Sequence, residues 1–361
     1  MITTDLCSVH VVVPGGIADP SVCSGGNLYD LRLLDGLAHG GRTVRELEVW
    51  GDWPYPAPAE CADLAAALDA VPDGATVLVD GLVACGIPEI VVPAARRVAV
   101  VVLVHLPLGD EAGAARELVA RERETLAAAA GVVATSPWTA RRLVALHGLD
   151  PDRIAVAAPG VDPAPLAPGT DGASHLLCVG SVTPTKGQDL LVEALALVAY
   201  LPWTCDLVGP VRRDPAHVAA VRAAVARHAL DARVRMTGPK MGTALDAAYA
   251  AADLLVVPSR AETYGMVVTE ALARGIPVLA TDVGGLPETL GHDPDSRVPG
   301  LLVPADDPGA LGGALWSWLE EPLLRNGLRR SAQGRRGMLH GWEVTSRCVI
   351  EALERWSGTR G

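Results

Sequence analysis

Short apolar runs alternate with longer amphipathic stretches along most of the chain. In the first half, runs rich in valine, leucine and isoleucine fall at 9–13, 76–80, 98–105, 131–136 and 154–157. Continuous apolar runs of this length are typical of strands buried on both faces, as in parallel sheets. The intervening stretches, including 111–129 and 138–147, follow a helical period. Strand–helix alternation predicts βαβ units and a doubly wound parallel α/β sheet.

A segment rich in proline and glycine, 159–172, interrupts this alternation. Such a density of both residues favours a linker over a regular element. The alternation then restarts, with strands expected at 175–180, 205–209, 234–238, 254–258, 277–281 and 301–304, and helices at 188–199, 215–229, 244–251, 266–274 and, after a broken helical stretch, 342–356. The sequence predicts an N-terminal domain at 1–165, a second domain at 172–337 and a final segment at 338–361.

In open α/β sheets, ligands bind beyond the carboxyl ends of the strands. The richest turn of this kind follows the strand expected at 254–258 and carries Glu262, Tyr264, Gly265 and Met266. Free N–H groups where the next helix begins, together with the helix dipole, suit a diphosphate. Glu270, two turns into that helix, could accept from ribose hydroxyls and Glu262 from those of a sugar. Taken singly, Glu262 is explained as an acidic residue that favours the dipole at the start of the helix, and Glu270 as a solvated residue on that helix.

The string 262–270 resembles the retaining glycosyltransferases of family 4, which have the GT-B fold of two Rossmann-like domains facing a central cleft. The stretches Ala271–Val278 and Thr281–Glu288 are also similar to that family. The resemblance implies that Glu262 contacts the donor sugar, Glu270 holds the ribose, and the amides between them hold phosphate. It implies an acceptor-binding first domain, a donor-binding second domain, and a final helix crossing back to the first.

A second turn, 179–187, ends in Lys186, one of only two lysines in the chain. A compact ammonium suits a diphosphate leaving group, although a surface lysine before a helix is the plain alternative. Similar enzymes have an arginine where Ser181 stands, so Ser181 joins the expected donor site with one phosphate cation fewer. Arg260 is the candidate to compensate.

In the first domain, His105 ends a buried strand and could bond the donor sugar or bridging phosphate, or could be a structural histidine. The loop before the first helix contains Gly25, Gly26 and Asn27. Glycines allow close approach of backbone to a ligand, and in similar enzymes this glycine pair lies beside the donor diphosphate while the loop helps bind the acceptor. The loop lacks the G-x-G-x-x-G fingerprint, so it does not support a nicotinamide cofactor.

Aromatic residues cluster after the second strand, at Trp50, Trp53 and Tyr55. Their faces could stack on an acceptor, but packing within the loop is at least as good an interpretation. No metal is expected, because GT-B enzymes generally use helix dipoles and cations, and no cofactor is expected beyond the nucleotide sugar as substrate.

Composition limits the classes of partner and the cellular compartment that we expect. A formal net charge of −12 argues against nucleic acid. The seven cysteines are scattered, without a C-x-x-C pair, and fit a reducing cytoplasm. The apolar runs are too short to span a bilayer, and the residues at the N-terminus lead us to expect no export signal.

Together these features predict a cytoplasmic hexosyltransferase that moves sugar from a nucleotide sugar, with a UDP-sugar favoured over GDP-mannose, to a small soluble acceptor. His105, Lys186 and Glu262 are the expected catalytic residues. The alternatives are a two-lobed solute-binding protein, which would need an export signal, and a GT-B nucleotide-sugar epimerase or phosphorylase.

Overall fold

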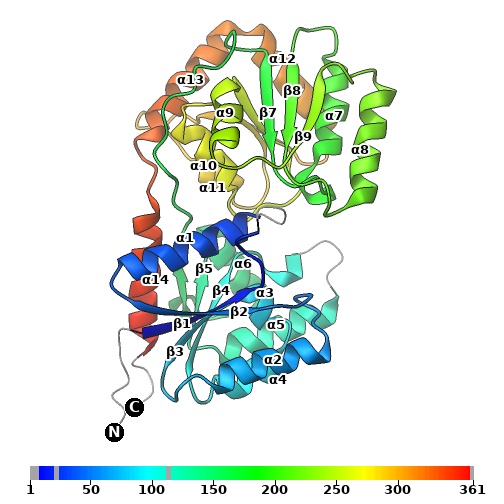
Figure 1. Ribbon diagram of the computed structural model, residues 1–361. Helices are drawn as coiled ribbons and strands as arrows, with labels where there is room; N and C mark the ends of the chain where they lie inside the picture. The colour runs from blue at the N-terminus through cyan, green and yellow to red at the C-terminus, as the bar shows by residue number, and fades with distance from the viewer. Residues whose placement is uncertain (1–7, 20–23, 111–114, 358–361) are drawn as a thin grey trace. The chain divides into compact units, whose positions relative to one another are not determined.

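The structure is a computed structural model that describes residues 8–19, 24–110 and 115–357 (Figure 1). The chain divides into two compact units. Unit 1 is Met1–Gly160 together with Gly341–Gly361, and unit 2 is Val161–His340. None of the described helices is long and apolar enough to cross a membrane.

Unit 1 contains a six-stranded parallel sheet in the order β2-β1-β3-β4-β5-β6. Its elements are β1 (Ser8–Pro14), α1 (Gly25–His39), β2 (Thr43–Val49), α2 (Pro58–Asp69), β3 (Thr76–Asp80), α3 (Gly81–Ala84), α4 (Pro88–Ala94), β4 (Ala99–Val104), α5 (Arg116–Ala128), β5 (Gly131–Ala134), α6 (Pro137–His147), β6 (Ile154–Val156) and α14 (Trp342–Ser357), with short 3-10 turns η2 (Leu108–Asp110) and η3 (Pro151–Arg153). The sheet confirms the expected α/β class.

Alternate side chains of these strands build two separate cores, as the pleat requires. Val12, Val77 and Val102 point to the core beneath α2, α4, α5 and α6. Their neighbours Val11 and Val101 point to the core beneath α1 and α14. The C-terminal helix α14 therefore covers part of one face of the first sheet. Its Trp356 packs so closely on β5 that a Cβ at Gly131 would lie 2.1 Å from the indole ring.

Unit 2 contains a second six-stranded parallel sheet, in the order β12-β11-β10-β7-β8-β9. Its elements are β7 (His175–Val179), η4 (Pro184–Lys186), α7 (Gln188–Leu197), β8 (Thr204–Val208), α8 (Pro215–Arg227), β9 (Val234–Gly238), α9 (Thr243–Ala251), β10 (Leu254–Val257), α10 (Met266–Ala273), β11 (Val278–Thr281), α11 (Leu286–Leu290), β12 (Gly300–Val303), α12 (Pro308–Glu320) and α13 (Pro322–Arg336). Helices cover both faces of this sheet as well (Figure 1).

The proline- and glycine-rich segment has no regular element in its described structure, but hydrogen bonds hold it to unit 2. The amide of Ala167 donates to the carbonyl of Arg274 at 2.9 Å, and that of Gly169 donates to Ala250 at 3.0 Å. This anchoring is the physical reason why the units divide at 160/161 and not at 165.

Candidate functional site

In unit 2 the chain runs from β7 outward to β8 and β9, and then returns to β10 on the other side of β7. The order is that of a Rossmann sheet, and β7 and β10 flank its topological switch point, where open α/β sheets bind ligands. The loop after β7 carries Lys186, and the loop after β10 carries Glu262. Strand order alone thus brings these two candidates together.

Backbone contacts lock the two loops to each other. The amide of Arg260 donates to the carbonyl of Thr185 at 2.7 Å. Gly187 adopts a φ of +67°, and a Cβ there would lie 2.0 Å from the carbonyl oxygen of Pro258. A side chain at position 187 would therefore force the loops apart.

Lys186 and Glu262 form an ion pair across this junction, with Nζ donating to Oε1. The glutamate side chain is only 13% exposed, whereas that of the lysine is 32% exposed. A partly desolvated pair of this kind is electrostatically stronger than a surface pair. It holds the ammonium of Lys186 beside the switch point of the second sheet.

Arg260 is committed to other partners. Its guanidinium makes a bidentate pair with Asp189 at 2.8 and 2.9 Å, and its Nε donates to Asp306 at 2.6 Å. A fourth bond of 2.6 Å reaches the carbonyl of Pro184. The hydrogen bonds with Asp189 raise the already high pKa of Arg260 further. In this structure Arg260 fastens the lysine loop to its neighbours, and its contact with a phosphate stays a prediction.

The beginning of α10 supplies backbone donors. Gly265, at a φ of +86°, precedes the helix, and a Cβ there would lie 2.5 Å from Leu286. In the described part of the chain, the amides of Gly265 and Met266 have no acceptor. They are the unpaired donors expected at a helix start. Tyr264 lies beside them, and burial raises the pKa of its hydroxyl to about 12, so it is neutral at physiological pH.

Gly284 and Gly285, the glycine pair of the 281–288 motif, pack directly against the backbone of the loop that carries Glu262. A Cβ at Gly284 would lie 1.8 Å from the carbonyl oxygen of Glu262, and one at Gly285 would lie 2.1 Å from that of Thr263. The amide of Gly285 also donates to the Glu262 carbonyl at 2.9 Å. The pair therefore fixes the backbone that presents the glutamate.

Glu270 lies on α10 and has a partner that the sequence did not reveal. The hydroxyl of Tyr249, a fully buried residue of α9, donates to Oε2 of Glu270 at 2.5 Å. Burial raises the pKa of Glu270, and the tyrosine opposes that shift. The Arg274 guanidinium stacks 4.7 Å from the Tyr249 ring centre, which keeps the phenol in place.

Ser181 lies in the turn directly after β7. The side-chain amide of Gln188, 1% exposed, donates to the carbonyls of Ser181 and Gly180 at 3.0 and 3.4 Å. These two hydrogen bonds fix the backbone of the turn that follows β7. The Ser181 hydroxyl adds no charge, so the lysine is the only cationic side chain that the 179–187 turn contributes.

His105 lies at the switch point of the first sheet, where the strand order reverses between β1 and β3. His105 follows β4 directly, and its Nε2 lies 2.9 Å from Oδ1 of Asp30 and 3.3 Å from Oδ2 of Asp80. Asp30 is on α1, and Asp80 is the last residue of β3. Sequence reasoning found the histidine but neither carboxylate.

The glycine loop lies against the same histidine. A Cβ added at Gly26 would lie 3.6 Å from the His105 ring, at ordinary van der Waals distance, so the glycine loop lies beside the imidazole. Ser24 caps α1 by accepting from the amide of Asn27 at 3.1 Å, and the two side chains bond at 2.8 Å. Gly25 is the first residue of the helix.

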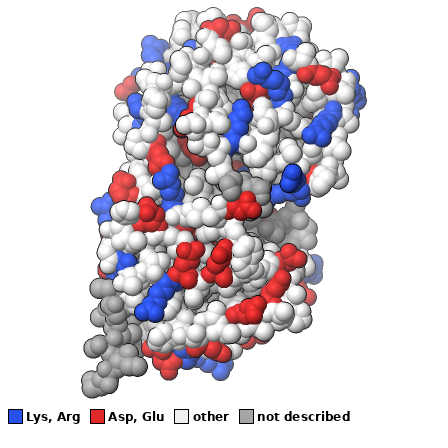
Figure 2. All heavy atoms as spheres, in the orientation of Figure 1, with Lys and Arg blue, Asp and Glu red and all other residues white. Residues whose placement is uncertain are grey.

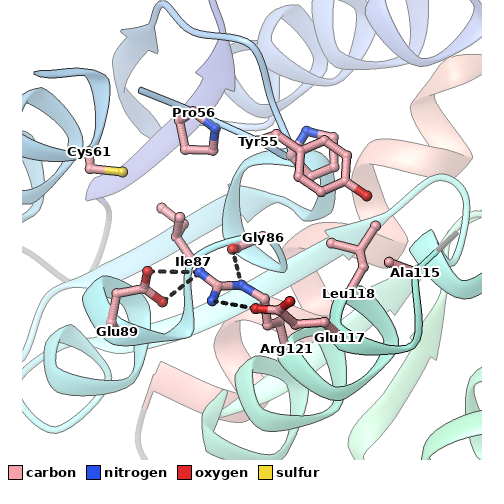
Figure 3. A pocket seen from close by; sticks show the side chains of 11 residues that line it. Tyr55, Pro56, Cys61, Gly86, Ile87, Glu89, Ala115, Glu117, Leu118 and Arg121 are labelled. Atoms are coloured by element: carbon pink, nitrogen blue, oxygen red, sulfur yellow. Dashed lines mark hydrogen bonds and ion pairs between the residues drawn. The ribbon is translucent and has the colours of Figure 1, made fainter. Parts of the chain in front are cut away.

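The aromatic candidates do not form one site. The Trp50 ring lies on Gly15, where a Cβ would come within 2.4 Å of it, and Trp53 Nε1 donates to the carbonyl of Val49 at 3.1 Å. Only Tyr55 lines the cavity of about 290 Å³ drawn in Figure 3. Arg121 lies in that cavity, held by both oxygens of Glu89 at 2.7 and 2.8 Å. The predicted acceptor roles of these aromatic residues and of Asn27 remain predictions.

Charged side chains of both signs are interspersed on the face drawn in Figure 2, which shows no large, purely basic area.

The five described cysteines, which are 61, 85, 178, 205 and 348, are free; Cys7 and Cys23 lie outside the described residues.

Solved structures share this architecture. The sucrose-phosphate synthase of Thermosynechococcus elongatus superposes with a TM-score of 0.79 at 22% identity, covering 95% of this chain and 97% of its own. HepE of Anabaena, in complex with UDP and glucose, gives a TM-score of 0.78 at 18% identity, covering 97% and 100%. The fold is that of the GT-B glycosyltransferases, as expected.

Family models match both halves of the chain. Residues 9–165 match the model described as Glycosyltransferase Family 4, and residues 173–321 match Glycosyl transferases group 1. The chain belongs to the family 4 glycosyltransferases, which confirms the resemblance given by the 262–288 motifs.

Among curated relatives, the D-inositol 3-phosphate glycosyltransferase of Jonesia denitrificans is 32% identical over 261 residues, 66% of this chain and 60% of that protein. The one from Kineococcus radiotolerans is 34% identical over 257 residues, 65% of this chain and 59% of that protein. The chain matches about 60% of the length of these relatives.

Proposed function

We propose that the protein is a retaining hexosyltransferase that uses a nucleotide-diphosphate sugar, with a UDP-sugar favoured and GDP-mannose next. The observation that carries the proposal is the Lys186–Glu262 pair at the switch point of the second sheet, beside the amides of Gly265 and Met266, which have no acceptor among the described residues. A cation, a sugar-binding carboxylate and helix-start amides within two adjoining loops suit a sugar diphosphate.

Different residues bind different parts of the nucleotide-sugar donor. The diphosphate lies against Lys186 and the start of α10, and Glu262 accepts from hydroxyls of the transferred sugar. Glu270 holds the ribose with Oε1, since Tyr249 already bonds Oε2. Backbone near 235–239, at the end of β9, meets the base. HepE bound to UDP-glucose in one of its crystal structures supports the uridine donor.

In the front-face reaction, the bond between the anomeric carbon and the phosphate oxygen breaks, and a bond to the acceptor oxygen forms on the same face. The acceptor proton passes to the leaving phosphate. Lys186 and the α10 amides stabilise the negative charge that grows on that phosphate, which is where preorganised donors contribute most. Glu262 and His105 orient the sugar as positive charge grows at the anomeric carbon.

The acceptor is a small soluble molecule with a free hydroxyl. The names of the curated relatives make D-inositol 3-phosphate the first acceptor to try. Unit 1 carries the candidate acceptor groups, among them Asn27 and Tyr55.

Purified protein is incubated with UDP-glucose, UDP-galactose, UDP-N-acetylglucosamine or GDP-mannose, with and without a panel of polyol and sugar acceptors. Free nucleoside diphosphate and a glycosylated product that appear only with acceptor support transfer, and the proton coupling at the anomeric carbon reports retention. Binding without turnover points to a solute-binding protein. A changed donor without acceptor points to an epimerase, and sugar 1-phosphate formed from inorganic phosphate points to a phosphorylase.

A further inference from the structure

Two buried carboxylates at the switch point of the first sheet have no role in the proposed reaction so far. Asp30 and Asp80 are 3% and 4% exposed. Both lie beside His105, which is partly exposed at the carboxyl end of its strand. Buried carboxylates are rare unless they are paired. Here both are paired with the same histidine, and the question is what that arrangement does to His105.

Both carboxylates address the same ring nitrogen. The Nε2–H of His105 is shared between Asp30 Oδ1 at 2.9 Å and Asp80 Oδ2 at 3.3 Å. Asp80 is itself fixed, because its Oδ1 accepts from the amide of Leu82 at 2.6 Å and so caps α3. Asp30 is carried by the regular helix α1.

The ring is also held from its other sides. Tyr29 meets it edge to face with ring centres 5.1 Å apart, and the Tyr29 hydroxyl donates to the carbonyl of Ala157 at 2.8 Å. Gly26 lies near the ring on the side of the glycine loop, where an added Cβ would be 3.6 Å from it. Among the described residues, Nδ1 of His105 has no hydrogen-bond partner, and it is the only ring nitrogen left to meet a ligand.

The charge state follows from this arrangement. Burial opposes protonation of His105, but the charge and hydrogen bond of Asp30, followed by those of Asp80, raise its pKa to about 10. Burial raises the pKa of Asp30 to about 6, even with the imidazole beside it. Near neutral pH the His105 ring is therefore an imidazolium, and it faces the ionised carboxylate of Asp30.

We propose that Asp30 and Asp80 are positioning residues that fix the His105 ring through Nε2 and keep it charged, so that Nδ1–H donates to a hydroxyl of the transferred sugar. This inference rests on the proposed function. It also decides between the two ligands open to His105: two carboxylates about 3 Å from its ring repel a phosphate, whereas they favour a sugar whose anomeric carbon becomes positive.

Asp30→Asn and Asp80→Asn remove one negative charge each with almost no change of shape. Asparagine at position 80 can still cap α3, so at least this variant is expected to fold. Asp35→Asn is the matched control, because Asp35 is an exposed residue of the same helix that also pairs with a histidine, His39. Circular dichroism and thermal midpoints check the fold of all three.

The first readout needs no substrate. In nitrogen–proton spectra, with the His105 signals assigned by His105→Gln, the wild-type ring stays protonated through pH 8. It titrates at least about one pH unit lower in Asp30→Asn and Asp80→Asn, and unchanged in Asp35→Asn. If the aspartate variants leave the titration of His105 where it is, the inference is wrong.

The second readout separates sugar from phosphate. Both aspartate variants lower the turnover of the nucleotide sugar at least about tenfold, most strongly at high pH, and bind the free nucleoside diphosphate as well as wild type does. An equal loss of nucleoside diphosphate affinity would contradict the assignment of His105 to the sugar.

The three groups also have ligand atoms within 4.8 Å of one another, as a metal site would. Wild-type turnover that EDTA abolishes and Mg²⁺ or Mn²⁺ restores, with the response lost in both aspartate variants, would overturn the inference in favour of a metal. A wild-type protein without any transferase activity would refute the proposed function and leave the titration experiment standing.

Discussion

The ammonium of Lys186 is bonded to the carboxylate of Glu262 across a sequence separation of 76 residues. The pair exists because β7 and β10 are neighbours in a sheet whose chain order reverses between them. It joins the proposed phosphate cation to the proposed sugar carboxylate, so loss of either partner affects both the geometry and the charge of the donor site.

Lys186→Met is expected to lower turnover at least about tenfold, because the leaving phosphate loses its nearest cation. Glu262→Gln is expected to do the same by weakening the hold on the sugar. In the double variant the losses are less than multiplicative, since the two residues act as one unit. Initial rates with a saturating nucleotide sugar measure this.

The surface pair Arg227–Glu193 in the same unit provides the control. Arg227→Met and Glu193→Gln are expected to leave turnover within about twofold, since exposed ion pairs contribute little. Wild-type rates in Lys186→Met or Glu262→Gln would refute the assignment of the donor site.

Tyr249→Phe is expected to raise the KM for the nucleotide sugar about three- to tenfold with little change in kcat. The variant removes one hydrogen bond to the Glu270 carboxylate and frees that side chain to turn away from the ribose. Tyr200→Phe, at an exposed position, is the control. A fall in kcat with unchanged KM would instead place Glu270 outside ribose binding.

Gly187→Ala is expected to destabilise unit 2 by about 2 kcal/mol or more and to abolish turnover, because the new methyl group meets the Pro258 carbonyl and strains a positive φ. Gly313→Ala, within α12 and with open space around it, is expected to be neutral or stabilising by up to about 1 kcal/mol. Urea unfolding measures both. Full stability in Gly187→Ala would show that the two loops are not locked as described.

The cluster around His105 predicts a pH dependence of stability. A pKa raised from 6.5 to about 10 means that protonated His105 stabilises the fold fully below pH 6.5, and that this contribution is lost as the pH rises through 10. The raised pKa of Asp30 gives a fall of the same sign between pH 3.8 and about 6.

The stability difference between wild type and His105→Gln should therefore be on the order of a few kcal/mol at pH 7 and shrink towards pH 10. Urea unfolding at pH 7, 8, 9 and 10 measures it. A difference that stays constant or grows with pH would show that the ring is neutral in the folded protein.

Much of the fold followed from hydrophobic periodicity, because strands buried on both faces leave continuous apolar runs, as in 76–80 and 254–258. The strand order did not follow, since it depends on contacts between segments far apart in the chain. The helix expected at 111–129 begins at Arg116 in the described residues, and residues 111–114 lie outside them.

The candidate site was partly visible in the sequence. Lys186 stood out because lysine is rare in this chain, and Glu262 because of its motif. Asp80 could have been suspected as a charge at the end of an apolar run, and Asp30 as an acidic residue adjoining the buried face of α1. The role of Tyr249 could not be predicted from the sequence, because a tyrosine in an alanine-rich helix looks like an ordinary core residue.

The most direct test is a crystal structure of the protein with a nucleoside diphosphate or an unreactive nucleotide sugar bound. We expect density for the diphosphate between the amides of Gly265 and Met266 and the ammonium of Lys186, with the ribose at Glu270. A ligand bound elsewhere, with these two loops unoccupied, would contradict it.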